Sequence, residues 1–235
     1  MRKHKWPCSI PGKRRDRSTS VFSLSVMQTP RPPPRIFVIT ARDVDAAIIF
    51  RRGPSDWFHI LKWDMTSDTL QPGAWFKGSL YPEKCDLSPD GELLLYFVLQ
   101  GSKFQTSYSG AWTAVSRAPW MHALGLWPQG ATYGGGGRFV SNRHVVIRSG
   151  NVIPHEDHPA TGLRVEAGNP ALNLSTSEVE QATWSGRDRS GRLIYARDGR
   201  LFRRHSTGVD IEIFNLCAMS PDPQPAPSWA SRDLA

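Results

Sequence analysis

The chain has 235 residues, of which 39% are hydrophobic and 21% are charged, an ordinary balance for a globular protein. Nine Trp and ten Phe supply enough large rings to bury a core even in a fold made of short strands. The longest apolar run of note, seven residues at 93–99, is far shorter than the roughly 20 residues that span a bilayer. We therefore expect a soluble protein rather than a membrane protein.

The formal net charge of +8 comes from the N-terminal end of the chain. Residues 1–35 hold nine Lys or Arg and one acid, whereas the remainder holds 20 basic and 20 acidic residues. A folded face that binds nucleic acid normally carries a surplus of positive charge. This balance argues against such binding by the folded part, and leaves the basic tail as the segment that could contact nucleic acid.

The cysteine pattern bears on the compartment. Cys8, Cys85 and Cys217 are too few and too scattered for a disulfide framework, so we expect free thiols in a reducing environment. The stretch 21–27 is too short and too rich in Ser for a secretion signal. The cytoplasm is therefore the expected location.

Residues 1–35 are predicted to be a disordered, basic, Pro-rich tail. They lack a hydrophobic pattern and end in the run Pro30-Arg31-Pro32-Pro33-Pro34. Either residues 1–26, upstream of Met27, are an extension without a structural role, or the tail is an arm that contacts RNA, DNA or an acidic surface. Patterned sequence begins at Ile36, and we place the folded domain at 36–220.

The first patterned segment predicts four antiparallel strands joined by short turns. Period-2 alternation and short apolar runs mark the strands, and clusters of Gly, Pro, Asp and Ser mark the turns between them. The predicted strands cover residues 36–40, 46–50, 57–64 and 69–77. A single meander of this kind cannot bury both of its faces, so it should pack against similar sheets.

Comparable units follow along the chain. A hairpin covers 84–100 around the turn Ser88-Pro89-Asp90-Gly91, a weaker copy covers 122–148, and a clearer one covers 181–216. Pro at the second turn position presets φ, and the terminal Gly accepts a positive φ. Between the last two units, residues 149–177 are interrupted by Pro and Gly, as expected for an inserted loop or poorly patterned outer strands.

Repeats of roughly 40–50 residues are typical of propellers. The sequence therefore predicts an all-β fold: a propeller-like array of four or five four-stranded antiparallel blades. The alternative is a β-sandwich, which would need the same alternation without a blade repeat. Residues 221–235 are predicted to form a C-terminal tail.

One stretch carries a family resemblance. Residues 88–97, SPDGELLLYF, resemble the core of the WD40-like repeat of TolB-type β-propellers, in which an innermost strand ends in Ser-Pro-Asp-Gly and the second strand ends in an aromatic residue. Residues 184–195, which contain Asp188-Arg189-Ser190-Gly191, are similar to a degenerate copy. The resemblance covers about 40 residues. It implies a propeller fold but no particular function, because propellers host many unrelated roles.

Three carboxylates are candidate site residues because they lie near the starts of predicted innermost strands: Glu83, Asp86 and Glu180. Several propeller enzymes place carboxylates there, and a pair of them could serve glycoside hydrolysis. A small hydrolase is therefore the alternative to a non-enzymatic binding or scaffold module, which the absence of a catalytic motif favours. The expected partner is a protein or a small molecule, no cofactor is expected, and the oligomeric state is not indicated.

Three other patterns are weaker candidates. The cluster HEDH at 155–158 is metal-like, but flanking prolines mark a surface loop and we expect no metal site. The glycines at 134–137 lack the following helix of a phosphate loop, so we expect them to permit close backbone approach. Cys85 could act as a nucleophile only if His59 or His122 reached it, and a buried thiol is the expected outcome.

Overall fold

The computed structural model describes residues 32–234 except 101–107, 109, 130–132 and 175–176. The basic tail predicted over residues 1–35 thus lies outside the described residues apart from its last four. The described part is all-β, as predicted: its one helix is the short 3-10 turn η1 (Pro82–Lys84). None of the described residues belongs to a helix long and apolar enough to cross a membrane.

The strands form four sheets, named A to D in chain order. Sheet A is a four-stranded antiparallel meander of β1 (Arg35–Thr40), β2 (Ala46–Arg52), β3 (Trp57–Asp64) and β4 (Thr69–Lys77). Sheet B contains β5 (Ser79–Leu80), β6 (Asp86–Leu87), β7 (Leu93–Leu99), β8 (Ala111–Arg117) and β9 (Ala123–Gln129). Sheet C contains β10 (Gly137–Ser141), β11 (His144–Ile147) and β12 (Arg164–Ala167). Sheet D is a second four-stranded antiparallel meander of β13 (Trp184–Arg187), β14 (Leu193–Arg197), β15 (Arg200–Arg204) and β16 (Asp210–Asn215).

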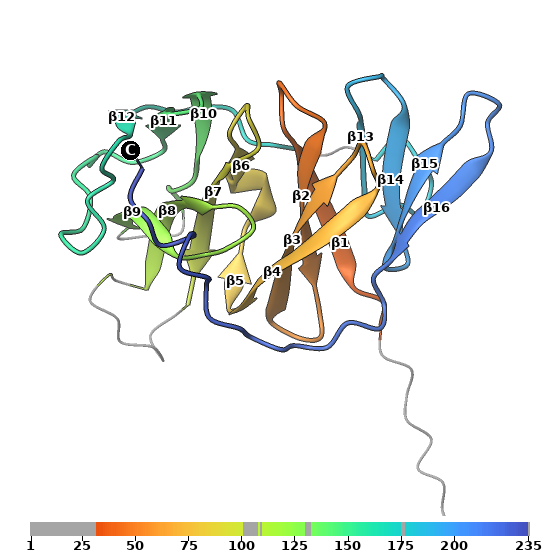
Figure 1. The fold of residues 1–235 in the computed structure, drawn as a ribbon, viewed down its shortest axis with the longest axis horizontal. Coiled ribbons are helices and arrows are strands. Elements are labelled where there is room, and N and C mark those ends of the chain that lie inside the picture. The colour runs from red at the N-terminus through yellow and green to blue at the C-terminus, as the bar shows by residue number, and fades with distance from the viewer. Residues whose placement is uncertain (1–31, 101–107, 109, 130–132, 175–176, 235) are drawn as a thin grey trace, which may run out of the picture. The chain divides into compact units, whose positions relative to one another are not determined.

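The sheets follow one another in space in the order D, A, B, C (Figure 1). Hydrogen bonds join the first turn of each sheet to that of the next. Arg189 Nη1 of sheet D donates to Asp43 O of sheet A at 2.6 Å. Asp43 N donates to Pro89 O of sheet B at 3.0 Å, and Asp90 N donates to Asn142 Oδ1 of sheet C at 3.1 Å. These contacts link the first turns of all four sheets along one edge of the array.

The first strand of sheet B is interrupted. β5 and β6 both pair with β7, at its two ends, and η1 lies between them. Pro82 at the start of η1 cannot donate to a ladder, which explains why pairing stops there. This break moves Tyr81, Pro82 and Glu83 out of the sheet, so that they form part of a cavity wall.

The turn at Ser88–Gly91 has the geometry that its sequence predicts. Gly91 has φ +73° and donates its N–H to Ser88 O at 2.8 Å. Ser88 Oγ accepts from the N–H groups of Glu92 and Leu93. After this turn every residue of 93–98 is buried, on both faces of β7. β7 is therefore an internal strand of sheet B with two buried faces.

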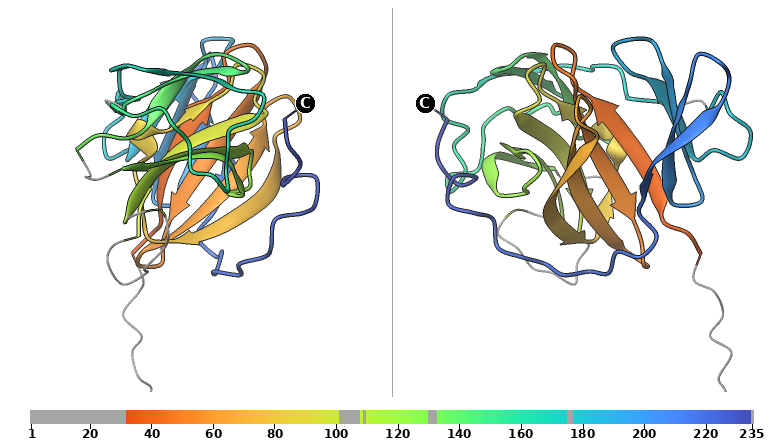
Figure 2. Two further views of the ribbon diagram at one scale, coloured as in Figure 1. Left: turned by 90° about the vertical axis from the view of Figure 1, so that its left-hand side faces the viewer. Right: turned by 45° about the vertical axis from the view of Figure 1, so that its right-hand side comes forward.

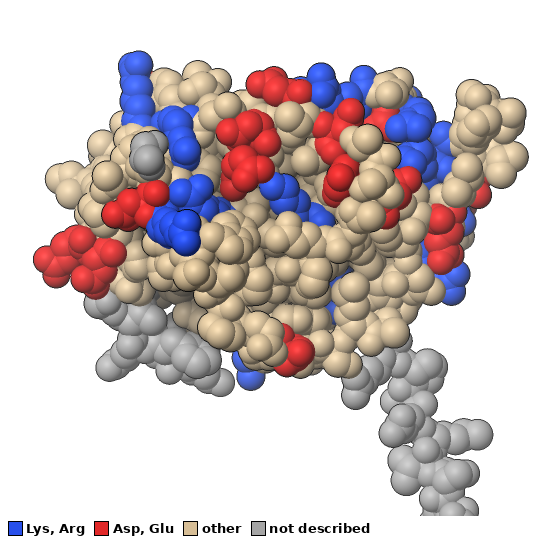
Figure 3. Space-filling view, in the orientation of Figure 1, with Lys and Arg blue, Asp and Glu red and all other residues tan. Residues whose placement is uncertain are grey.

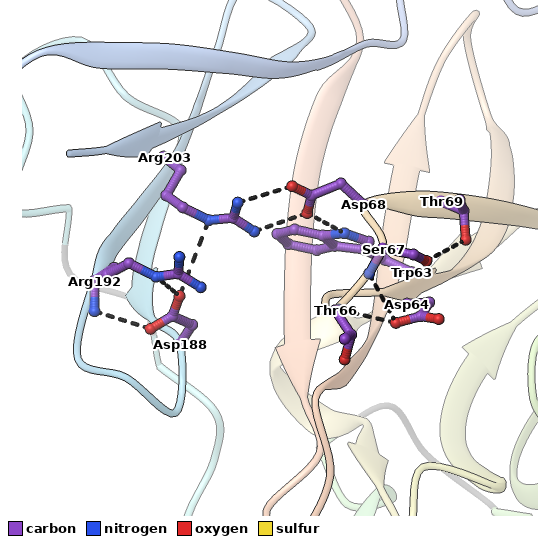
Figure 4. A network of polar contacts seen from close by, with 9 residues as sticks. All are labelled: Trp63, Asp64, Thr66, Ser67, Asp68, Thr69, Asp188, Arg192 and Arg203. Carbon is purple, nitrogen blue, oxygen red and sulfur yellow. Dashed lines mark hydrogen bonds and ion pairs between the residues drawn. The ribbon is translucent and has the colours of Figure 1, made fainter.

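A polar network reinforces the contact between sheets A and D (Figure 4). Arg203 of β15 forms two hydrogen bonds of 2.8 Å with Asp68, in the turn between β3 and β4. The hydrogen bonds from Arg203 lower the pKa of Asp68. Asp68 also accepts from the Trp63 indole at 3.2 Å. On the other side, Arg203 Nε lies 4.0 Å from the buried carboxylate of Asp188.

Two segments without a clear sequence pattern also pack onto the array. β12, within the region 149–177, pairs with β11 in parallel, an arrangement that needs a long connection. The C-terminal segment runs along the edge of the sheets from sheet D towards sheet C (Figure 2). Its residues Ala230 and Leu234 are buried, and Arg117 of β8 donates to the carbonyls of 232 and 233. Part of the predicted tail 221–235 is therefore packed against the sheets.

Candidate functional site

The first strands of the four sheets meet around a cavity of about 280 Å³, which we call the central cavity. It is lined by residues of β1, β6, β10 and β13 and of the segment before β13: Phe37, Val38, Ile39, Thr40, Arg42, Asp86, Arg138, Asn173, Leu174, Trp184 and Ser185. Phe37 and Trp184 pack with their ring centroids 6.3 Å apart. The polar groups come from all four sheets and from the loops beside them, so only the assembled array creates this site.

Asp86 is the one carboxylate among the residues that line the central cavity. Its side chain is 4% exposed, and its Oδ2 accepts from Phe139 N–H at 2.8 Å. The same oxygen lies 3.4 Å from Arg42 Nη1 and 3.9 Å from Arg138 Nε. Burial raises the pKa of Asp86, while the Phe139 N–H and the two guanidinium groups oppose the rise. Asp86 thus acts as a hydrogen-bond acceptor that ties β6 to β10.

Arg42 and Arg138 are fixed by contacts beyond Asp86. Arg42 Nη2 donates to Phe139 O at 2.6 Å, and Arg138 Nη1 donates to Asn173 Oδ1 at 2.8 Å. Asn173 in turn donates to the carbonyls of Cys85 and Glu83. The two arginine side chains remain 39% and 32% exposed, so their guanidinium groups are positioned and still accessible. With two cations and one anion, the cavity can accept a small acidic group.

The three predicted site carboxylates occupy different places. Asp86 lines the central cavity, as described above. Glu83 lies on η1 and lines a second cavity between sheets A and B. Glu180 is exposed in a turn before β13 and lines neither cavity.

The other candidates have structural roles. Cys85 is fully buried, burial raises the pKa of its thiol, and its Sγ donates to Tyr81 O at 3.2 Å. Both ring nitrogens of His158 are occupied, Nδ1 by Ala123 O at 2.8 Å and Nε2 by the Tyr108 hydroxyl at 3.1 Å. Among the described residues, no group of three or more His, Cys, Asp or Glu is placed to hold a metal ion.

The glycine run at 134–137 permits close packing, as predicted. A Cβ on Gly135 would overlap the Phe97 ring, and a Cβ on Gly136 would overlap Lys84 O. The Gly136 N–H donates to Thr113 Oγ1 at 2.8 Å, and the Gly135 N–H donates to Arg148 O at 2.8 Å. Because these N–H groups are already used within the protein, they do not form a phosphate cradle.

Sequence reasoning missed Arg42, Arg138 and Asn173. Arg42 lies in the turn after β1, Arg138 is the second residue of β10, and Asn173 lies in a region without a strand pattern. These three residues do not occupy equivalent positions in the repeated units, so the repeat does not single them out. They meet only because sheet A lies beside sheet B and sheet B beside sheet C, which no local pattern indicates.

Charged side chains gather along the upper edge of the face in Figure 3, where basic and acidic residues alternate. Along this edge, positive and negative side chains of the described residues are therefore interspersed. No family model, no curated protein and no solved structure matches this chain significantly.

Proposed function

We propose that residues 36–220 form an open, propeller-like array of four blades that serves as a non-enzymatic binding module. The two turns that resemble WD40-like repeats support the blade repeat. Each joins the first strand of its sheet to the second, and Gly91 and Gly191 have φ +73° and +78°. The Gly191 N–H donates to Asp188 O at 2.9 Å, as the Gly91 N–H does to Ser88 O at 2.8 Å.

The outer face of sheet D favours an open array rather than a closed ring. On this face, which points away from sheet A, the fully buried Tyr195 stacks on Phe202 with ring centroids 5.2 Å apart. Arg197 lies over both rings, and Arg204 over Tyr195, at 5.5–5.6 Å. Arg204 also forms an ion pair of 2.8 Å with Asp210. Charged side chains that cover aromatic rings in this way suit a face that ends an array, as polar caps do in repeat proteins.

The observation that carries the proposed function is the convergence of the four first strands on the central cavity. Arg42 and Arg138 are held in place there with donors to spare, which is the preorganisation that favours recognition of a carboxylate. We propose that the ligand is the acidic side chain of a partner protein. The cytoplasm, where Cys85 would remain a free thiol, is the proposed location.

The hydrolase alternative receives less support. A mechanism with two carboxylates requires both groups to flank one bond. Asp86 is the single carboxylate that lines the central cavity, while Glu83 lines a different one. The oxygen of Asp86 that faces the arginines is already bonded to Phe139 N–H.

A random peptide display against the full chain tests the proposal. We expect the selected peptides to share an Asp or Glu, and their binding to weaken about tenfold in the variant Arg42→Gln/Arg138→Gln. Arg200→Gln, an exposed arginine of sheet D, is the matched control and should bind as the wild type does. Selected peptides without a shared acid, or equal binding by both variants, would contradict the proposal. Ester or glycoside hydrolysis that is lost in Asp86→Asn would instead support the hydrolase.

A further inference from the structure

A second cavity of about 420 Å³ lies between sheets A and B, at the end of β1 opposite to the central cavity's arginines; we call it the lateral cavity. Its volume is within the range typical of small-molecule sites. One wall comes from the first three strands of sheet A, and the other from the interrupted first strand of sheet B. The lining residues are Arg35, Ile36, Phe37, Phe50, Arg52, Phe58, Ser79, Leu80, Tyr81, Pro82, Glu83 and Thr183.

The register of sheet A builds one wall from paired residues. Phe37 of β1 lies directly opposite Phe50 of β2, and two residues along, Arg35 lies opposite Arg52. Arg52 in turn lies opposite Phe58 of β3. Because side chains alternate along a strand, all five project from the same face of the sheet. Two arginines therefore lie beside a floor of phenylalanine rings, of which Phe50 and Phe58 are held nearly fully buried.

The two arginines lack an acidic partner in the described part of the chain, since no ion pair joins either to a carboxylate there. Both are exposed. Like charges directly opposite each other on neighbouring strands destabilise a sheet. The Arg52 guanidinium lies 5.7 Å from the centroid of the Phe58 ring, a contact that uses its charge and leaves its N–H groups for an acceptor.

From this arrangement we infer that the lateral cavity binds a small organic acid, with its carboxylate between Arg35 and Arg52 and an apolar body against the phenylalanine rings. The anion relieves the repulsion between the two arginines and accepts charge-assisted hydrogen bonds from both. Glu83, on the facing wall, limits the net positive charge of the cavity, which favours one carboxylate over a polyanion. This inference does not depend on the proposed function, because the two cavities use different arginines.

Titration of the full-length protein with 3-phenylpropionate, followed by calorimetry or NMR, tests this inference. We expect saturable binding, and binding about tenfold weaker for 3-phenylpropanol, which has the same ring but no charge. Arg35→Gln/Arg52→Gln should weaken binding of the acid by about the same factor and leave binding of the alcohol unchanged. Arg143→Gln, an exposed arginine in the turn between β10 and β11, removes a positive charge elsewhere and should change neither.

Three outcomes would overturn the inference. The first is equal affinity for the acid and the alcohol, which would leave only an apolar pocket. The second is undiminished binding of the acid by Arg35→Gln/Arg52→Gln, shown to be folded by circular dichroism. The third is an absence of saturable binding by a panel of aromatic and branched aliphatic carboxylates at millimolar concentration. Loss of peptide binding at the central cavity would leave this inference unaffected.

Discussion

The central and lateral cavities each combine two arginines with one carboxylate, yet the residues are connected differently. In the central cavity, Asp86 lies within 4 Å of both Arg42 and Arg138, and each arginine also holds a carbonyl or amide oxygen. In the lateral cavity, Arg35 and Arg52 face each other across two strands, and Glu83 lies on the opposite wall. The first set of charges ties the sheets together and still leaves its two arginines partly exposed, whereas no carboxylate of the described residues pairs with the arginines of the second set.

The same contrast separates two neighbouring residues of β2. Arg51 is buried and donates to the carbonyls of Gly53, Leu216, Cys217 and Met219, so that it fastens the C-terminal segment to sheet A. Arg52 points to the other face of the sheet, towards the lateral cavity. The presence of an arginine at a position therefore does not by itself indicate whether its role is structural or ligand-binding. The number of protein acceptors around each guanidinium distinguishes a structural arginine from one available to a ligand.

Substitution of Arg51 should have the largest effect. Arg51→Gln removes a buried guanidinium from four carbonyl groups, of which that of Leu216 is buried, and we expect the free energy of unfolding to fall by about 4 kcal/mol. Arg52→Gln is the matched control one residue away and should change it by less than about 0.5 kcal/mol. Urea unfolding of both variants measures the difference. Similar losses in the two variants would remove the distinction between structural and available arginines.

The pH dependence of stability tests the environment of Arg51 on the same face. Burial, together with the charge of Arg51, lowers the pKa of His59 from 6.5 to about 4, and His59 stacks on Trp75 with ring centroids 4.2 Å apart. Because the unfolded chain binds this proton first, the contribution of His59 is complete above about pH 6.5 and is lost towards about pH 4. We expect this loss to be about 3 kcal/mol relative to His59→Phe, measured by urea unfolding across that range. Parallel pH profiles for wild type and variant would show that His59 is not held neutral.

Removal of the carboxylate should destabilise the protein more in the central cavity than in the lateral cavity. Asp86→Ala leaves the Phe139 N–H and two arginines without their common acceptor, and should cost about 2 kcal/mol of unfolding free energy. Glu83→Ala, in the lateral cavity, should cost less than about 0.5 kcal/mol. Thermal unfolding of the two variants side by side suffices. A larger loss in Glu83→Ala would mean that the lateral cavity, not the central one, is held together by its charges.

Much of the fold could be predicted because it depends on local pattern. The predicted strands 57–64 and 69–77 match β3 and β4, and the Ser88–Gly91 turn joins the strands that it was expected to join. Two features could not be predicted. β12 has only four residues and pairs in parallel after a long connection, so its polar–apolar alternation is too short to indicate a strand. Ala230 and Leu234 are buried singly in a Pro-rich segment, which lacks any hydrophobic period.

The candidate sites were less predictable than the fold. Asp86 was found because it begins a recognisable strand, whereas its arginine partners lie in other sheets and gave no signal. One wall of the lateral cavity, in contrast, left a signal in the sequence. Once the turn at 43–45 is placed, the register of the hairpin pairs Arg35 with Arg52 and Phe37 with Phe50, and so reveals two facing arginines beside two facing rings. The opposite wall could not be anticipated, because it requires sheet B to pack on this face.

The most direct test of the account is the stability of two double variants that remove the same charges. Arg42→Gln/Arg138→Gln breaks contacts that join sheets A, B and C, and we expect the free energy of unfolding to fall by about 2 kcal/mol. Arg35→Gln/Arg52→Gln relieves a like-charge pair, and should leave that free energy unchanged or raise it by up to about 0.5 kcal/mol at low salt. Equal destabilisation of both variants in urea would contradict the claim that the lateral arginines do not contribute to the stability of the fold.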